Sequence, residues 1–251
     1  MVPGRAVLDV PRALVGWVAM LIVTREGDRR CRLSTSGRAL AAPVYLKKID
    51  TPTRIAAGFG ISVGTAHAYV HSVVALLARR APVLTAALRS SDAGYVALDG
   101  TLVECDRVGD SRADYTGEHR RHGVNLQAIT TPEGTLVRIS PALAGRVHDL
   151  TAARRHRIIA TCVRLGILIL ILANMAYQGA GDTVTVPHRR RPGKDLNTKQ
   201  KSFNRAHSRL RRPVERAIAR IKTWHILHKA RLNPNKPTSI TKAILTLETH
   251  R

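Results

Sequence analysis

The spacing of apolar residues changes near residue 92, and this change constrains the fold more than any other feature of the sequence. Before it, apolar residues recur at helical intervals, as in Leu14, Val18 and Leu21. Beyond it lie short strand-like runs, over residues 95–98, 124–129, 136–140 and 167–172. A helix is predicted over 150–165, before the last of these runs. This order predicts an all-α N-terminal region followed by an α/β layer.

Two apolar segments are too short to cross a bilayer. Residues 166–173 read GILILILA, a length and composition typical of a buried strand. Residues 13–23 span only about half a bilayer and follow no cluster of basic residues, which favours a core helix over a signal peptide. We therefore expect no membrane attachment.

The charge is extreme and uneven. The formal net charge is +24, of which residues 1–90 carry +9 and residues 188–251 carry +15, while residues 91–187 are neutral. Such a balance predicts a polyanionic partner. Cys31, Cys105 and Cys162 have neither zinc-site nor disulfide-framework spacing and are predicted to be reduced thiols. We expect a cytoplasmic protein, associated with the nucleoid.

Residues 50–80 have the outline of a helix-turn-helix. Thr51 can cap a helix that begins at Pro52, residues 58–60 (Gly-Phe-Gly) break it, and Ser62 can cap a second helix that runs to about Arg80. A plain helical hairpin would show the same pattern. If the second helix reads DNA, its outward polar candidates are Thr65, His67, Tyr69 and His71.

Two acids stand out in their surroundings. Asp99 follows a strand-like run and precedes Gly100, so we expect its carboxylate at a strand end, where it could bind Mg²⁺. An Asp-Gly pair can equally form a simple turn. Glu215 is the only acid between Lys199 and Ile221, in a helix dense in arginine. It is either an ion-pair partner or a metal ligand whose neighbours hold phosphates.

Several motifs in this order and spacing resemble one known family. They are LDGT, GVNLQAI, SPALAGRVHDLTAAR, ANMAYQGAG and RRPVERAIARIKTW, over about residues 95–247. This part resembles the transposases of the IS5-related group, with a DDE superfamily endonuclease domain of RNase H-like fold. The upstream segment TPTRIAAGFGISVGTAHAYV resembles the helix-turn-helix that precedes that domain. The resemblance implies an RNase H-like mixed sheet flanked by helices over 95–248, after an all-α domain over 1–90.

The resemblance also implies a site in which Asp, Asp and Glu hold two divalent ions, Mg²⁺ or Mn²⁺. Asp99 matches the first acid and Glu215 the third, but Asn174 occupies the position of the second. The family usually reads Ala-Asp-Lys-Gly-Tyr there, so the chain departs at residues 174–176. An amide is a weaker ligand than a carboxylate, so we expect weakened metal binding and impaired catalysis.

Four other acids are candidates to replace the missing one. Asp149 matches a motif of its own, and we predict that it caps a helix instead. Asp182 lies beyond a Gly-rich turn, and Asp106 and Asp114 lie in a polar stretch where solvated loop acids are expected. None of them is predicted to replace the acid that is missing at position 174.

Basic residues near the predicted site are candidates for phosphate contacts. They are His119, Arg120, Arg121 and His122 before the second strand, and Arg209, Arg212 and Arg216, which share one helix face. A solvated basic surface is the alternative for both groups. Trp224 could stack on a base, although core packing is the preferred interpretation.

The sequence thus predicts a transposase, impaired by Asn174, that cuts transposon ends and joins them to target DNA. The alternative is a catalytically dead remnant that still binds DNA sequence-specifically. Either would bind double-stranded DNA, namely terminal repeats and target, and bringing two ends together would require at least a homodimer. An RNA-binding protein is disfavoured because only 4% of residues are aromatic.

Overall fold

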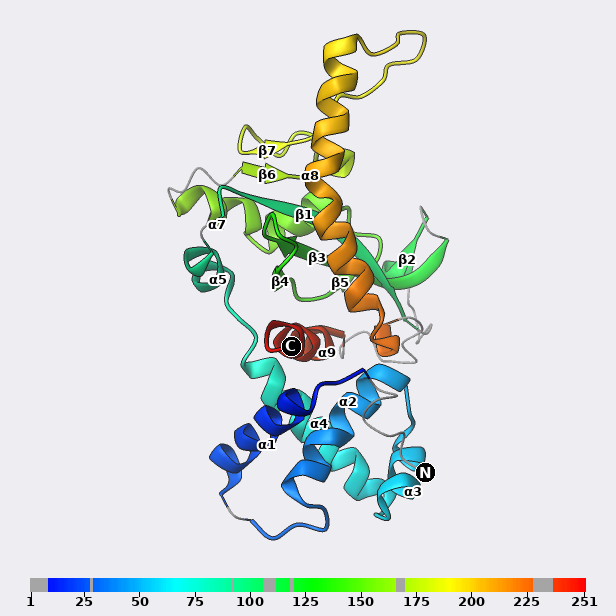
Figure 1. Ribbon diagram of the computed structural model, residues 1–251. Coiled ribbons are helices and arrows are strands. Elements are labelled where there is room, and N and C mark those ends of the chain that lie inside the picture. Colours follow the sequence, from blue (N-terminus) through cyan, green and yellow to red (C-terminus); the bar gives the residue numbers. More distant parts are fainter. Residues whose placement is uncertain are drawn as a thin grey trace. The chain divides into compact units, whose positions relative to one another are not determined.

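The computed structural model describes residues 9–27, 29–91, 93–105, 112–117, 120–165, 170–227 and 237–251 (Figure 1). The chain divides into two compact units. The helical unit comprises Met1–Ala81, Ile221–Ala230 and Thr238–Arg251, and the sheet unit comprises Pro82–Arg220 and Arg231–Pro237. This division differs from the predicted domains 1–90 and 95–248, because C-terminal residues join the N-terminal helices.

The helical unit is built from amphipathic helices. They are α1 (Arg12–Glu26), α2 (Thr35–Lys48), α3 (Pro52–Phe59), α4 (Val63–Arg79), the 3₁₀ turn η4 (His225–Leu227) and α9 (Pro237–Thr249). The apolar face predicted for α4 is buried, from Ala66 through Val70 and Val73 to Leu77. Burial of this face, together with those of α1 and α2, forms the core of the unit.

The predicted caps define the α3 and α4 pair. Thr51 Oγ1 accepts a hydrogen bond from the Arg54 amide at 3.2 Å, and Pro52 is the first helical residue. Gly60 ends α3 with φ +66°, a left-handed conformation that favours glycine. Ser62 Oγ then accepts from the Thr65 amide at 3.2 Å to start α4. The two helices meet at a bend of 105°, which confirms the predicted helix, turn and helix.

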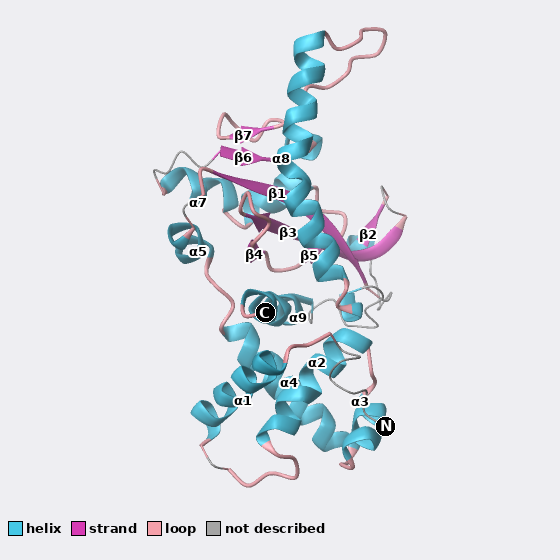
Figure 2. Ribbon diagram, viewed as in Figure 1, coloured by secondary structure: helices cyan, strands magenta, loops and turns pink. Residues whose placement is uncertain are grey.

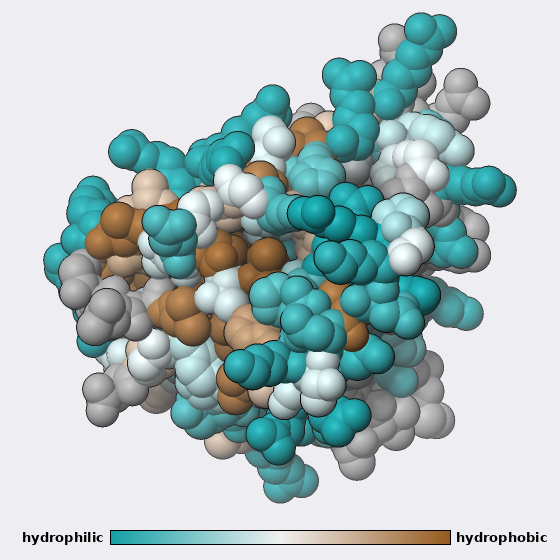
Figure 3. All heavy atoms as spheres, turned by 90° about the horizontal axis from the view of Figure 1, so that it is seen from above, coloured by the Kyte–Doolittle hydropathy of each residue, from teal (hydrophilic) through white to brown (hydrophobic). Residues whose placement is uncertain are grey.

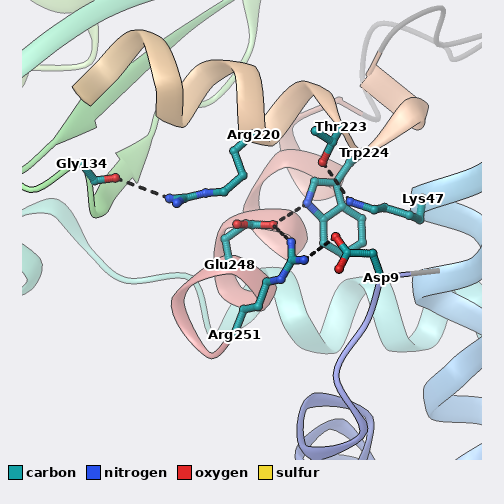
Figure 4. A network of polar contacts seen from close by, with 8 residues as sticks. All are labelled: Asp9, Lys47, Gly134, Arg220, Thr223, Trp224, Glu248 and Arg251. Carbon is teal, nitrogen blue, oxygen red and sulfur yellow. Dashed lines mark hydrogen bonds and ion pairs between the residues drawn. The ribbon is translucent and has the colours of Figure 1, made fainter. Parts of the chain in front are cut away.

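Polar contacts attach the C-terminal segments to the helical unit (Figure 4). Trp224 is buried, and its Nε1 donates to Glu248 Oε1 at 2.8 Å. Lys47 Nζ donates to Thr223 Oγ1 at 2.9 Å and lies 4.8 Å from the centre of the indole ring. Arg251 pairs with Glu248 at 3.6 Å. Trp224 is thus a core residue and is not exposed for base stacking.

The sheet unit contains a mixed sheet in the order β2-β3-β1-β6-β7 (Figure 2). Its strands are β1 (Tyr95–Glu104), β2 (Tyr115–Thr116), β3 (Arg121–Thr130), β4 (Leu136–Ile139), β5 (Leu143–Ala144), β6 (Leu170–Leu172) and β7 (Val184–Thr185). β1 is antiparallel to β3 and parallel to β6. The four predicted strands all appear, although residues 167–169 of the last lie outside the described part of the chain.

Helices flank this sheet. They are α5 (Leu84–Ser90), α6 (Asp149–Arg155), α7 (Ile158–Arg164) and α8 (Thr198–Lys222), with the 3₁₀ turns η2 (Arg112–Asp114) and η3 (Met175–Tyr177). The predicted single helix over 150–165 is two helices, because Arg157 adopts φ +54° between them. Val96 and Leu98 pack in one buried cluster with Leu88 and Cys162, so α5 and α7 cover one face of the sheet.

The long helix α8 crosses the sheet. A ring nitrogen of His207 lies 3.0 Å from the Thr185 carbonyl of β7, and Arg211 contacts Asp99 of β1. Farther along, Arg220 donates to the carbonyl of Gly134, in the turn after β3, at 3.4 Å (Figure 4). These contacts place α8 along the sheet (Figure 1), and Arg211 of α8 reaches Asp99 of β1.

The described helices offer no single segment that is both long and apolar enough to span a membrane; only α3 and α4 taken together reach that length and hydropathy. The three cysteines are free thiols, as predicted.

Candidate active site

Asp99 lies inside the strand β1. The prediction that Asp99 lies at a strand end was therefore wrong, and so was the alternative that Asp99 and Gly100 form a simple turn. β1 continues to Glu104 because its antiparallel pairing with the long strand β3 extends that far, and Asp99 lies opposite Ala128 in this pairing. The parallel pairing of β1 with β6, however, stops at Ala97 and Leu172. Asp99 therefore lies just beyond the parallel part of the sheet, which is where α/β sheets expose their functional side chains.

Asn174 meets Asp99 at this point. Both residues lie two positions beyond the last parallel pair, and Asn174 Nδ2 donates to Asp99 Oδ1 at 2.9 Å. Asn174 Oδ1 accepts from the Ala176 amide at 2.8 Å and starts the 3₁₀ turn η3. Because a backbone N–H can only donate, this second contact fixes the orientation of the amide. The nitrogen of Asn174, and not its oxygen, thus faces Asp99.

Arg211 connects Asp99 to Glu215. Its Nη2 lies 3.2 Å from Asp99 Oδ2, and its Nη1 lies 4.0 Å from Glu215 Oε1, one helical turn along α8. The side chains of Asp99 and Arg211 are 15% and 10% exposed, whereas that of Glu215 is 55% exposed. The guanidinium therefore neutralises a largely buried carboxylate, and Glu215 lies at the solvent edge of the same arrangement.

Asp149 also belongs to this region. It is the first residue of α6, and the helix is capped by His148, whose ring accepts from the Leu150 amide at 3.4 Å. The prediction that Asp149 is the helix cap was therefore wrong, because its carboxylate is turned toward the sheet. There, Asp149 Oδ1 accepts from Asn125 Nδ2 at 2.6 Å and from Gln127 Nε2 at 3.1 Å.

A cavity of about 440 Å³ opens between these groups. Asp99, Asn174 and Asp149 all line it, together with other residues of β1 and of the turn before α6. Glu215 does not line the cavity. The cavity is therefore a polar recess that contains two carboxylates and an amide.

The protonation of Asp99 is strongly perturbed. The pKa of Asp99 is raised from 3.8 to about 6, chiefly by burial of the carboxyl; Arg211 lowers it, and the nearby charges of Asp149 and Glu215 raise it. A bound cation would act in the same direction as Arg211 and favour the ionised form. Such perturbation is typical of functional sites.

The donor set suits a divalent ion of the magnesium type, which prefers carboxylate oxygens. Asp99 and Asp149 supply such oxygens to one cavity, and Arg211 already provides a positive charge beside them. Within the described ranges, no three His, Cys, Asp or Glu side chains are grouped so as to hold a metal ion. The residues thus fit the chemistry of a divalent ion, with fewer acids than a triad requires.

The polar candidates of α4 lie in different environments. His67 is exposed and Thr65 is half-buried, with its hydroxyl 2.8 Å from Ser62 Oγ. Tyr69 is turned inward, since its hydroxyl accepts from the Arg32 amide at 3.1 Å. His71 is half-buried, and its ring lies 4.0 Å from that of His67. Of the four, His67 presents the most accessible side chain.

The arginine candidates are exposed, whereas His122 is half-buried. Arg209, Arg212 and Arg216 face solvent on α8, while Arg211 is the buried arginine among them. Arg120 is exposed, and Arg121 pairs with Glu104. Hydrophilic residues occupy much of the face drawn in Figure 3, with apolar residues exposed at several places among them. His119 lies outside the described residues.

The sequence interpretation missed the residues that hold Asp149. Asn125 and Gln127 alternate with apolar residues in β3, and both are buried. Gln127 Nε2 donates to Asn125 Oδ1 at 2.8 Å, and Tyr177 donates its hydroxyl to Gln127 Oε1 at 2.5 Å. Polar residues at every second position of an otherwise apolar strand were the available signal, because a buried strand face rarely carries amides without a partner.

Comparisons with known proteins agree with this architecture. Residues 98–248, more than half of the chain, match the family described as DDE superfamily endonuclease. Residues 31–82 match the helix-turn-helix of DDE superfamily endonuclease, which supports the predicted DNA-binding role of α3 and α4. The named relative is "Putative transposase for insertion sequence element IS112" of Streptomyces albus G. It is 28% identical over 219 residues, 84% of this chain and 80% of the relative.

No solved structure matches the chain. The helical region followed by a mixed α/β sheet flanked by helices is the predicted fold class, and the two family matches fall on its two parts in the same order. This chain therefore belongs to the DDE superfamily endonuclease family.

Proposed function

We propose that the chain is a transposase of the IS5-related group that binds the ends of its own element and cleaves them poorly. One contact carries the proposal: Asn174 donates a hydrogen bond to Asp99 at 2.9 Å from the position where the resemblance expects the second acid. A donor at this position cannot serve as a ligand to a cation that Asp99 binds, and the Asn174 oxygen is engaged by the Ala176 amide.

The residues of the sheet unit support hydrolytic and strand-transfer chemistry on a phosphodiester. A divalent ion, when bound, would activate the attacking oxygen and stabilise the leaving one. Asp99 would hold that ion at the cavity, and Arg211 would keep the Asp99 carboxylate ionised. Glu215, at the solvent edge, would complete the site once DNA covers it. Loss of one ligand charge would lower the cleavage rate by orders of magnitude.

The DNA would contact both units. His67 and Thr65 on α4 would approach bases in the major groove, with Tyr69 and His71 supporting the helix from its inner side. Arg209, Arg212 and Arg216 would contact phosphates beside Glu215, joined by Arg120 and Arg121. Two ends held together require at least a homodimer, and a DNA-bound protein of this charge would be found in the cytoplasm with the nucleoid.

A second candidate function is a DNA-binding remnant without cleavage activity. The same Asn174 contact favours it, because both the nitrogen and the oxygen of the Asn174 amide are engaged by protein partners. Both candidates predict specific binding to the terminal repeats with a steep salt dependence. They differ only in whether phosphodiester bonds break.

The deciding experiment is strand cleavage of DNA carrying the element's own terminal repeats, in Mg²⁺ or Mn²⁺. We expect slow cleavage by the unaltered chain and a gain of at least about 100-fold for Asn174→Asp, which restores a ligand and a charge. Equal rates for both proteins would overturn the proposed impairment. No cleavage by either protein, with specific binding retained, would support the remnant.

A further inference from the structure

Asp149 places a second carboxylate beside Asp99, and a role for it in metal binding rests on the proposed metal-dependent function. Asp99 and Asp149 both line the 440 Å³ cavity. Glu215, although it matches a family acid, lies outside the cavity lining and is 55% exposed. In the geometry of this chain, therefore, the carboxylate that accompanies Asp99 in the cavity is that of Asp149.

Asp149 is held by a buried amide bracket formed by Asn125 and Gln127. Their donated hydrogen bonds, of 2.6 and 3.1 Å, both end on Asp149 Oδ1, and neither ends on Oδ2. Gln127 is fully buried and is itself fixed by the hydroxyl of Tyr177. A carboxylate oriented through one oxygen by rigid donors keeps the other oxygen for a ligand, as in metal sites with a supporting shell of hydrogen bonds.

The strand leaves space for this carboxylate at Gly100. A Cβ at Gly100 would lie 2.1 Å from Asp149 Oδ1 and 2.5 Å from Oδ2, closer than any side chain allows. Gly100 does not have a positive φ, so its backbone conformation does not require glycine. The absence of a side chain at position 100 is thus explained by the approach of Asp149 to the strand beside Asp99.

We propose that Asp149 is a metal ligand of this site, which with Asp99 supplies the second negative charge that Asn174 does not. Two carboxylates on one cavity offer a divalent ion the hard oxygen ligands it prefers. Asn174 then has a positioning role, because its Nδ2 holds Asp99 Oδ1 toward the cavity. The residual activity of the proposed transposase would depend on Asp149.

The test is Mn²⁺ binding to the full chain without DNA, measured by calorimetry and by the electron paramagnetic resonance signal of free Mn²⁺. Asp149→Asn keeps the shape of the side chain and an oxygen for the amide bracket, so we expect binding at least about tenfold weaker. Asp182→Asn, on an exposed acid outside the cavity, is the matched control and should bind as the unaltered chain does. Circular dichroism would establish that each variant is folded.

Rescue separates a ligand from a merely structural residue. In the double variant Asp149→Asn with Asn174→Asp, a carboxylate returns to the cavity and should restore most of the Mn²⁺ affinity. Unchanged affinity in Asp149→Asn, or failure of the rescue, would overturn the assignment of Asp149 while leaving the proposed transposase in place. No Mn²⁺ binding by the unaltered chain would overturn this assignment and, with it, the cleavage-competent version of the proposed function.

Discussion

Asn174 Nδ2 donates a hydrogen bond of 2.9 Å to Asp99 Oδ1, so the two side chains are complementary without a metal ion between them. Two carboxylates at this separation would repel each other unless a proton or a metal ion lay between them. The contact between Asn174 and Asp99 therefore stabilises the metal-free protein, and substitutions at these two residues should change stability and metal response together.

Asn174→Asp should destabilise the metal-free protein. The variant loses a hydrogen bond to a charged group and places a second carboxylate against Asp99, at a cost of about 1.5–3 kcal/mol at pH 7.5. Mg²⁺ should recover part of this loss, since it would bind the folded variant. Thermal unfolding with Mg²⁺ and with a chelator measures both effects. An identical melting temperature in the two buffers would contradict the prediction.

Asp99 should make the protein less stable as the pH rises. Its pKa is about 6 in the folded chain against 3.8 unfolded, so the folded state holds the proton more tightly. The stabilisation is present below about pH 4 and is lost as the pH rises through 6, on the order of 3 kcal/mol in total. Denaturant unfolding of the unaltered chain and of Asp99→Asn in chelator, at intervals from pH 4 to 7.5, should show this slope only with Asp99. Parallel curves would refute it.

Arg211 should matter to stability far more than its sequence neighbour. Arg211→Gln removes the cation from the buried carboxylate of Asp99, and breaking such a pair costs about 3 kcal/mol. The exposed Arg212→Gln should change the free energy of unfolding by less than about 0.5 kcal/mol. Urea unfolding at pH 7.5 compares the two variants directly, and similar costs would show that the Asp99–Arg211 pair is not a stabilising contact.

The exposed arginines of α8 should govern salt dependence of DNA binding. Replacing Arg209, Arg212 and Arg216 by Gln removes three proposed phosphate contacts, so the slope of log K against log salt should fall by about 0.9 for each. Fluorescence anisotropy with labelled duplex DNA at several salt concentrations gives the slope. Arg164→Gln, on the exposed end of α7, is the control. A loss of affinity without a change of slope would indicate indirect effects.

The sequence was informative where local patterns decide the structure. Thr51, Gly60 and Ser62 placed the turn between α3 and α4 because capping and left-handed conformations depend on one or two residues. The apolar spacing of α4 was equally reliable, since burial of one helix face repeats along the chain. These features need no knowledge of distant segments.

Long-range pairing could not be predicted in the same way. Asp99 was expected at a strand end because its local sequence resembles a turn, but the partner β3 extends the strand to Glu104. Asp149 was expected to cap a helix. Only the fold shows that its carboxylate lies against Gly100 and accepts a hydrogen bond from Asn125. Arg211 was not separated from the other arginines of its helix, because its burial depends on the sheet that α8 crosses.

The C-terminal helix α9 has a consequence for the order in which the protein forms. Thr246 of α9 donates its hydroxyl to the Leu77 carbonyl of α4 at 3.0 Å, a contact between residues 169 positions apart. At a synthesis rate of about 5–20 residues per second, α9 therefore follows α4 by roughly 8–34 seconds. The helical unit therefore lacks α9 until the end of synthesis, although its first helices are made first. Most of the sheet unit is synthesised before α4 of the helix-turn-helix can contact α9.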